Sequence, residues 1–470
     1  MWKCIEAMKW TTGLALLALC LVVKTTAQDF RAGVAAVDIT PPLGIPIAGY
    51  YHARGADGVL DPLLSKALVV ESGGDHVAFV VLDLISVPRA VTDQARAAIE
   101  RETGIRGAHV MISATHTHTG PVLDTRAQRD RAIGHQEKLS LDYTTALPSK
   151  IVECVRLAYG ALGAARLRVA QGRCEALAFN RRFFMRDGTV GWNPGKLNPN
   201  ITMPAGPVDD EVAILQVDWP AGPGPARAIA TYVNFAMHPD TTGGTKLSAD
   251  WPGALGRVLA QYFGSNHLTL LANGTCGNIN HLDVSWNWPQ KGVSEANRIG
   301  IVLGAAVLQS LKSLRPVTNG PWRVRSEVVE LPLPEVTPAQ VEQARRDVES
   351  TRDDQGGNFM KLVRAHRVLD IASRSGDPCR VEVQVIALGR DLAWVALPGE
   401  VFVELGLAIK KRSPFPCTFV VELANENIGY IPDRRSYAEG NYEPESARCA
   451  AGSGERLVDA AVRVLEALRL

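Results

Sequence analysis

The chain has no excess of charge of either sign. Its 470 residues contain 50 Lys and Arg against 49 Asp and Glu, and no acidic tail is present. A protein that binds a polyanion such as nucleic acid usually carries a clear basic excess. We therefore expect a small-molecule or lipid-like substrate, and no nucleic-acid partner.

Long apolar runs are missing except near the N-terminus. There, residues 13–23 form an uninterrupted apolar run, with Lys3 and Lys9 before it and Thr25-Thr26-Ala27 after it. This layout is typical of a secretory signal peptide, and the run is short for a bilayer span, which takes about 20 residues. We predict a signal peptide over residues 1–27, a secreted or periplasmic protein, and no transmembrane helix in the mature chain. An uncleaved membrane anchor is the alternative.

Cysteines are few, and none of them has the Cys-x-x-Cys spacing of a structural zinc site. Two of the eight, Cys4 and Cys20, lie in the predicted signal peptide. An oxidising compartment would permit disulfides among the others, but the sequence leaves their pairing open. The remaining six are Cys154, Cys174, Cys276, Cys379, Cys417 and Cys449.

The mature chain alternates short apolar runs with longer amphipathic stretches, and it contains no repeat and no Pro- or Ser-rich linker. This pattern predicts an α/β domain with a mixed, largely buried β-sheet flanked by helices. We expect one catalytic domain over residues 28–470. Strands are expected at 67–70, 77–82, 109–113, 212–217, 228–235, 268–272, 381–388 and 392–397, and helices from 88 and at 252–263, 294–311, 338–374, 401–411 and 455–468.

A His-x-His pair, His116 and His118, directly follows one of these strands and precedes Gly120-Pro121. Residues two apart in an extended chain point to the same side, so both imidazoles can face one cavity at the end of the strand. Imidazole is the commonest metal ligand in proteins. A metal site and exposed loop histidines are equally compatible with this motif alone.

Two further strands end in polar residues beside a turn. His238 follows the strand at 228–235, and Glu400 follows Pro398-Gly399 after the strand at 392–397. Two histidines and one carboxylate, with one position open for water, form a catalytic zinc arrangement rather than a structural one. Compensation of a helix dipole is the alternative role of Glu400. Asp250, which opens a helix, is interpreted as a cap.

Taken in order, these segments resemble the neutral ceramidase family, a group of neutral and alkaline non-lysosomal ceramidases. The resemblance covers nearly all of the mature chain and rests on the number and order of the motifs. They are residues 32–40, 47–50, 81–84, 115–121, 180–181, the segment around His238, and residues 397–400, 427–431 and 441–443.

The resemblance implies a zinc-dependent amidohydrolase that cleaves the N-acyl bond of ceramide to sphingosine and a fatty acid. The zinc ligands would be His116, His238, Glu400 and Tyr430. Catalytic polar groups around the substrate carbonyl would be His118, Arg181 and Tyr442, with Arg181 also holding a polar head group. Gly49 would approach the substrate through its backbone.

Two features depart from the family pattern. The family carries a serine, often described as the nucleophile, in a turn that here reads as residues 273–281 and holds no serine. Thr275 or Cys276 could lie near that position, but we favour direct attack by zinc-bound hydroxide and interpret Cys276 as a small buried residue. We also expect no C-terminal immunoglobulin-like domain. Alternative functions are a zinc esterase or amidase on another conjugate, or a degenerate zinc-binding exported protein.

Overall fold

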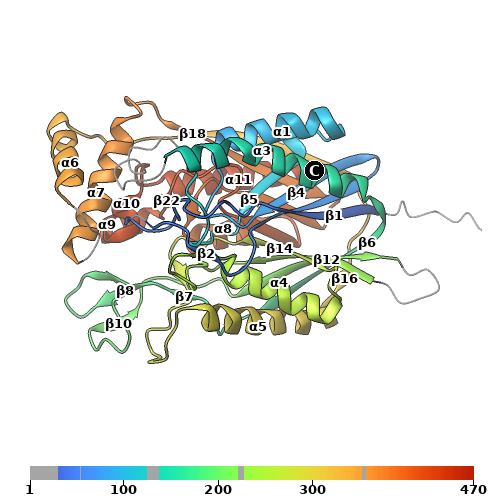
Figure 1. Cartoon of the computed structure of the whole chain (residues 1–470), viewed down its shortest axis with the longest axis horizontal. Helices are drawn as coiled ribbons and strands as arrows, with labels where there is room; N and C mark the ends of the chain where they lie inside the picture. The colour runs from blue at the N-terminus through green and yellow to red at the C-terminus, as the bar shows by residue number, and fades with distance from the viewer. Residues whose placement is uncertain (1–29, 53, 124–136, 221–226, 352–355, 470) are drawn as a thin grey trace, which may run out of the picture.

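A computed structural model describes residues 30–52, 54–123, 137–220, 227–351 and 356–469 (Figure 1). The predicted signal peptide at 1–27 lies outside these residues. No helix in the described ranges is long and apolar enough to cross a membrane.

The larger of two main sheets has nine strands in the order β14-β12-β11-β6-β1-β3-β4-β5, with β16 paired to β6. Neighbours are antiparallel except for β12 with β14 and β4 with β5, which are parallel. Six of its strands, β3, β4, β5, β11, β12 and β14, are apolar and buried along most of their length, as expected for a sheet covered on both faces. The bounds are β1 Phe30–Asp38, β3 Leu64–Ser72, β4 Asp75–Leu82, β5 Val110–Ala114, β6 Gly163–Arg173, β11 Glu211–Trp219, β12 Arg227–Phe235, β14 Leu268–Asn273 and β16 Arg315–Pro316.

The second main sheet has four strands in the order β17-β18-β19-β21. Its strands β19 and β21 are parallel, and the other neighbours are antiparallel. The remaining strands form short two- and three-stranded ribbons. The bounds are β17 Trp322–Leu331, β18 Cys379–Leu388, β19 Leu392–Ala396 and β21 Cys417–Val421, and for the ribbons β2 Gly58–Val59, β7 Phe179–Asn180, β8 Arg182–Met185, β9 Val190–Trp192, β10 Ile201–Pro204, β13 Lys246–Leu247, β15 Ile279–Asn280, β20 Glu400–Val401 and β22 Tyr430–Ile431.

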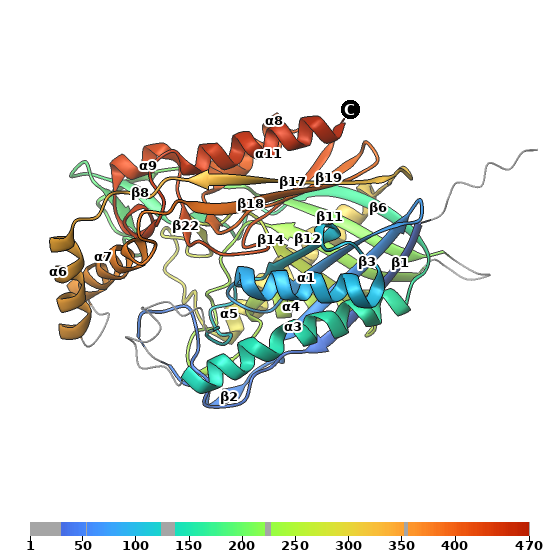
Figure 2. The same cartoon turned by 90° about the horizontal axis from the view of Figure 1, so that it is seen from above.

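The two main sheets pack face to face, with helices outside each of them (Figure 2). Phe79 and Tyr232 of the large sheet pack against each other, and Phe79 also packs against Trp394 of the small sheet. Trp394 in turn stacks on Phe419 of its own sheet, so the central core lies between the two sheets. Helices α1, α3, α4 and α5 cover the outer face of the large sheet, and α8 and α11 cover that of the small sheet. The bounds are α1 Arg89–Thr103, α3 Glu137–Gly160, α4 Asp250–Phe263, α5 Val293–Ser310, α6 Pro338–Ser350, α7 Gly357–Ala372, α8 Val403–Arg412, α9 Arg434–Glu439, α10 Tyr442–Ser446 and α11 Ser453–Arg469.

The helix expected over 338–374 is divided into α6 and α7. Thr337 caps α6: its hydroxyl accepts from the Gln340 N–H, and the Gln340 side chain accepts from the Thr337 N–H. Pro338 occupies the first turn. This is a capping box with proline at a tolerated position. The two helices pack through Ala344, Ala365 and Leu369 and project from one end of the molecule.

Asp250 does not cap α4 in the way predicted. Ala249 occupies the N-cap position, and Asp250 is the first helical residue with a left-handed φ of 55°. Its carboxylate instead accepts from the N–H groups of Thr241, Thr242 and Trp251. The side chain therefore holds the loop after His238 against the start of α4.

The α/β class with a mixed, buried sheet flanked by helices is confirmed. The structure adds strands β1, β6, β17 and β21 and the helix α3, none of which was predicted. The carboxyl ends of β5, β12, β14, β19 and β21 meet at one end of the two sheets, where Ser113 bridges to Ala424 and β12 and β14 continue into adjacent turns. Loops after these strands form the candidate site.

Candidate functional site

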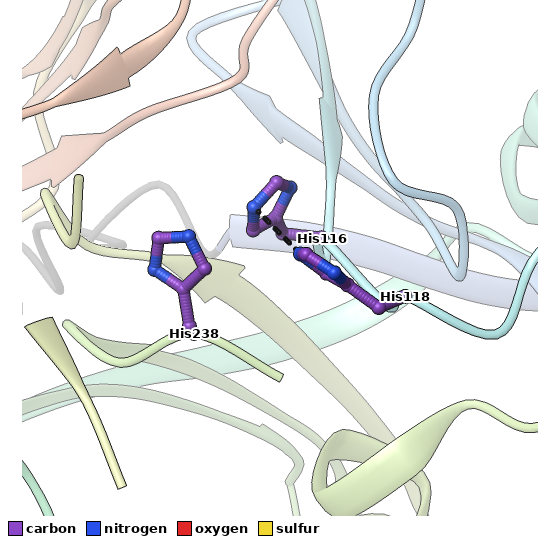
Figure 3. Close-up of side chains that lie close together, drawn as sticks. All are labelled: His116, His118 and His238. Atoms are coloured by element: carbon purple, nitrogen blue, oxygen red, sulfur yellow. Dashed lines mark hydrogen bonds between the residues drawn. The ribbon is translucent and has the colours of Figure 1, made fainter. Parts of the chain in front are cut away.

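His116 and His118 lie on the loop that follows β5 (Figure 3). The hydroxyls of Thr117 and Thr119, which alternate with the histidines, both donate to Ser248 O at 2.8 Å and hold the loop in place. His116 adopts a left-handed φ of 74°, which is unusual for a non-glycine residue and is a form of strain found at functional sites. The His116 Nδ1 donates to Ile85 O at 2.8 Å, so its Nε2 carries the lone pair.

His238 follows β12 and faces His116 from the opposite side, with ring centroids 4.6 Å apart. Its Nδ1 lies 2.8 Å from Cys276 O and 3.0 Å from Ile279 O, and these carbonyls accept its hydrogen. The Nε2 therefore carries the lone pair in His238 as well. A backbone carbonyl that fixes the tautomer in this way is the usual outer partner of a metal-binding histidine.

Glu400 lies close to both histidines and forms a cluster with His116 and His238. Its Oε2 lies 3.3 Å from His116 Nε2 and 3.4 Å from His238 Nε2. The Glu400 Oε2 and the His238 Nε2 are both buried, and neither has a hydrogen-bond partner among the described residues. Unsatisfied buried polar atoms are rare, and the binding of an ion is one of their ordinary explanations.

The electrostatics of this cluster favour a cation. Burial by itself would raise the pKa of Glu400, but the attraction of the two facing histidines, His116 first, outweighs it and holds the pKa well below its usual range. Burial, helped by the positive charge of Arg181, lowers the pKa of His238 to about 3, so this ring is neutral at neutral pH. An ionised carboxylate and a neutral imidazole are the protonation states that a metal ion requires.

His118 lies beside the same cluster, so its position suits either a metal ligand or a substrate-binding group. The Nε2 atoms of His118 and His116 are 3.3 Å apart, and His116, His118 and His238 each offer a nitrogen within 4.8 Å of the others. These three histidines could hold a metal ion. The sequence analysis placed His118 beside the substrate carbonyl instead, and both arrangements fit the position of the ring.

Tyr430 lies opposite Glu400 in the parallel ribbon of β20 and β22, and its phenol oxygen accepts from Arg181 Nη2 at 3.0 Å. Arg181 is buried, and it also donates to Glu443 Oε1 at 2.7 Å and to Gly277 O at 2.6 Å. These three partners hold Arg181 in place. Arg181 does not line the cavity in front of the cluster itself, but it contacts Tyr430, which does. Burial raises the pKa of Tyr430 well above its usual value despite the positive charge of Arg181, so the phenol is neutral.

Tyr442 approaches Tyr430 from the start of α10, with ring centroids 5.3 Å apart. It packs against Trp192 of β9 and Phe359 of α7, at 4.5 and 5.1 Å between centroids. Rings packed in this way fix the direction of the Tyr442 hydroxyl. Gly49, with φ 108°, lies against the His118 ring, where an added Cβ would come within 2.7 Å of Nδ1.

Cys276 is fully buried behind His238 rather than in front of it. Its thiol donates to Glu422 Oε1 at 3.0 Å and lies 3.3 Å from His238 Nδ1, the ring atom that faces away from Glu400. Burial and the negative charge of Glu422 raise the pKa of the thiol well above its usual value. Thr275 is also buried and faces Gly406 of α8. The interpretation of Cys276 as a small buried residue agrees with this position.

A cavity of about 1100 Å³ opens in front of the cluster, and His116, His118, Glu400, Tyr430 and Tyr442 all line it. Gly49 lines it as well, whereas the buried His238 contributes from behind. The structure thus brings the predicted site residues into one region.

Sequence reasoning missed the buried carboxylates that support the site. Glu422 accepts from the N–H groups of Cys276 and Val401 and so joins the turn below His238 to the segment that carries Glu400. Burial raises its pKa to about 8. A carboxylate directly after an apolar strand was the signal that selected Glu400, and the same signal would have selected Glu422. Glu443, which binds Arg181 and Arg182, lay in a motif that was noted without a role.

Comparison with known proteins agrees with this picture. The family model for the N-terminal part of neutral/alkaline non-lysosomal ceramidases matches residues 30–187. That span holds Gly49, His116, His118 and Arg181, and it ends before His238.

Solved structures extend the similarity in fold. The neutral ceramidase from Pseudomonas aeruginosa superposes with a TM-score of 0.72 at 19% identity, covering 94% of this chain and 75% of that one. A ceramidase complexed with C2 gives a TM-score of 0.71, also at 19% identity, covering 94% and 76%. The chain therefore resembles the neutral/alkaline non-lysosomal ceramidases, by sequence over its N-terminal third and by fold over nearly its whole length.

Proposed function

We propose that this protein is an exported, zinc-dependent hydrolase of N-acyl amide bonds in ceramide-like substrates. The observation that carries the proposal is the convergence of His116 Nε2, His238 Nε2 and Glu400 Oε2 at the bottom of a large cavity. The resemblance to ceramidases supports hydrolysis of an amide. The donor set supports zinc, which favours imidazole and carboxylate ligands.

His116, His238, Glu400 and Tyr430 would hold the ion. When bound, zinc lowers the pKa of a water molecule toward about 7 and polarises the substrate carbonyl. Arg181 donates to the phenol oxygen of Tyr430 and leaves the phenol hydrogen free to be lost. Its guanidinium would then stabilise the phenolate, which suits a tyrosine ligand.

His118 and Tyr442 are the polar groups best placed to meet the substrate carbonyl, since both line the cavity beside the cluster. A carbonyl that becomes tetrahedral develops negative charge on its oxygen, and preorganised donors stabilise that charge. The aromatic packing of Tyr442 against Trp192 provides such preorganisation. Gly49 would let the backbone approach the substrate, because any side chain at this position would strike His118.

Metal analysis and turnover on one preparation test this proposal. The expected result is about one zinc per chain, with activity lost on chelation and restored by zinc. His118→Ala distinguishes the two roles of that residue, because a ligand variant loses metal whereas a substrate-binding variant keeps metal and loses kcat. Folded protein that binds no transition metal would refute the proposal.

Export rests on the predicted signal peptide over residues 1–27, and we propose residues 28–470 as the zinc hydrolase domain. N-terminal sequencing of the protein recovered outside the cell should begin after Ala27. Recovery only from the membrane fraction, with Met1 or Met8 retained, would favour the anchor.

A further inference from the structure

The cavity in front of the metal-binding cluster has two unlike walls. Beyond the site itself, one wall comes from the loop after His118 and from α1 and α3. It presents the apolar side chains of Val91, Val122, Leu123 and Leu141, next to the polar Arg89, Gln94, Thr144 and Thr145. The opposite wall comes from the end of α7 and the segment after α10, and it presents Asp370, Ser373, Arg374, Ser446 and Arg448. A ceramide head group is uncharged, so it gives no reason for two guanidinium groups on this wall.

Arg448 is the better fixed of the two. Its Nε donates to Asp370 Oδ2 at 2.8 Å, and its side chain is 23% exposed. A Cβ added to Gly429 would lie 2.8 Å from Arg448 Nη1, so the guanidinium rests on the backbone beside Tyr430. Its two terminal nitrogens make no hydrogen bond to any of the described residues. This leaves one edge of the planar group available to a ligand.

Arg374 adds a second positive charge to the same wall. It lines the cavity just past the end of α7, and within the described ranges it forms no ion pair. Both guanidinium groups lie near Cys379. A hydrogen bond with the Cys449 thiol, together with the positive charges of Arg374 and Arg448, lowers the pKa of the Cys379 thiol to about 7 despite its burial.

Asp370 is paired with Arg448, and Glu426, which also lines the cavity, is paired with Arg89, so among the described residues Arg374 is left without a carboxylate partner. The other arginine of the cavity, Arg89, differs in this respect. It is bound to Glu426 at 2.9 Å and to Asp93 at 3.0 Å, and both of its charge partners are carboxylates. Of the three arginines that line the cavity, Arg374 is therefore the one whose charge no carboxylate of the described residues offsets.

We propose that Arg448 and Arg374 form an anion subsite that selects amides whose amine portion carries a carboxylate, that is, N-acyl amino acids. The proposal rests on the proposed function. The acyl chain would lie along the apolar wall, and the scissile amide would meet the metal-binding cluster. The carboxylate would then reach the two guanidinium groups, which match its geometry with paired N–H donors. Hydrolysis would add water across the C–N bond and release a fatty acid and an amino acid.

The test compares N-lauroylglycine with N-lauroylethanolamine, which share the acyl chain and differ in a carboxylate against a hydroxymethyl group. We expect kcat/KM of the zinc-loaded enzyme to be roughly tenfold higher for N-lauroylglycine, the value of one charge-assisted hydrogen bond. Arg448→Gln and Arg374→Gln should each remove most of this preference through KM. Arg448→Lys should retain part of it, and Asp370→Asn should increase it.

Calorimetric binding of both compounds to metal-depleted protein gives a second readout that needs no turnover. Arg345→Gln, an exposed arginine of α6, is the matched control and should change neither measurement. Should the Arg448 variants fail to fold, Arg374→Gln, Asp370→Asn and the salt dependence of the wild-type preference decide the question.

The outcomes separate the two proposals. A binding preference without hydrolysis of either compound would support the subsite and refute the proposed function. Equal binding and equal turnover of the two compounds would refute the subsite and leave the hydrolase. A preference for N-lauroylglycine that survives both arginine substitutions would also refute the subsite.

Discussion

Each histidine of the candidate metal centre gives its Nδ1 hydrogen to the backbone, and the two remaining nitrogens point at the same carboxylate oxygen. An ordinary core histidine satisfies both of its nitrogens within the protein. The sequence could place His116, His238 and Glu400 at strand ends, because apolar runs followed by polar residues are visible in it. It could not show which strand ends meet, since that depends on strand order.

The first prediction concerns these ligands. His238→Ala should abolish activity and lower bound zinc well below one per chain, because the site loses a donor atom that no nearby group replaces. Turnover and elemental analysis on the same preparation measure both effects. His267→Gln is the control, since that buried histidine lies beside Thr231, away from the cavity, and should leave both values unchanged. Full zinc occupancy in His238→Ala would show that the ligand assignment is wrong.

The second prediction concerns the turn that lacks the family's serine. Cys276→Ala should keep activity within about threefold, because the thiol lies behind His238 and is held protonated by burial and by Glu422. A buried, protonated thiol that faces away from the cavity is not an activated nucleophile. Steady-state kinetics at saturating substrate measure the effect. An acyl group found on Cys276 by mass spectrometry would contradict the prediction directly.

At the scale of elements, the strands found from the sequence are those buried on both faces, because their apolar residues are contiguous. The strand β17 was missed because it alternates charged with apolar residues and lies at the edge of the small sheet. The helix α3 was missed partly because it contains Pro148, which normally ends a helix. The hairpin of α6 and α7 was expected only as a helical stretch over 338–374, whereas α7 begins after Gly356, which has a positive φ of 55°.

The third prediction concerns the packing of α4 against α5. Gly300 of α5 lies so close to α4 that an added Cβ would come within 2.5 Å of Ala254 Cβ and 2.7 Å of backbone atoms. Gly300→Ala should therefore lower the free energy of unfolding by about 1–3 kcal/mol, as measured by urea titration.

Gly256→Ala is the matched control for this substitution. In the same helix pair, the nearest atom to its added Cβ is 3.9 Å away, so the change should raise the free energy of unfolding by about 0.5–1 kcal/mol. Equal effects of the two substitutions would show that the helices lie farther apart than described.

At the scale of the whole molecule, the face-to-face packing of two sheets is what brings the site together. His116 and His238 come from the large sheet, whereas Glu400 and Glu422 follow strands of the small sheet. The sequence predicted one mixed sheet, because strand periodicity reports burial and not membership of a sheet. The candidate metal centre therefore depends on how the two halves are held in register.

One partly buried ion-pair network joins these halves away from the cavity. Lys410 of α8, on the side of the small sheet, donates to Asp209 at 2.7 Å and to Glu211 of β11 at 2.9 Å. Burial alone would lower the pKa of Lys410, but the attraction of the two carboxylates outweighs it and raises the pKa above its ordinary value of 10.5. The network therefore stabilises the folded state fully below that pH. This contribution is lost as the pH rises through the pKa of the folded state.

The last prediction follows from the upward shift of the Lys410 pKa. Lys410→Met should lower the free energy of unfolding by about 3 kcal/mol at pH 7, because two carboxylates lose their shared partner in a largely buried position. The difference from wild type should stay constant between about pH 7 and 10 and shrink above about pH 10.5, where wild-type Lys410 also loses its charge. Lys411→Met, at the exposed neighbouring position, should change the stability by less than about 0.5 kcal/mol throughout. Urea titrations across this pH range measure all three proteins, and a Lys410→Met difference that grows at alkaline pH would contradict the assigned direction of the shift.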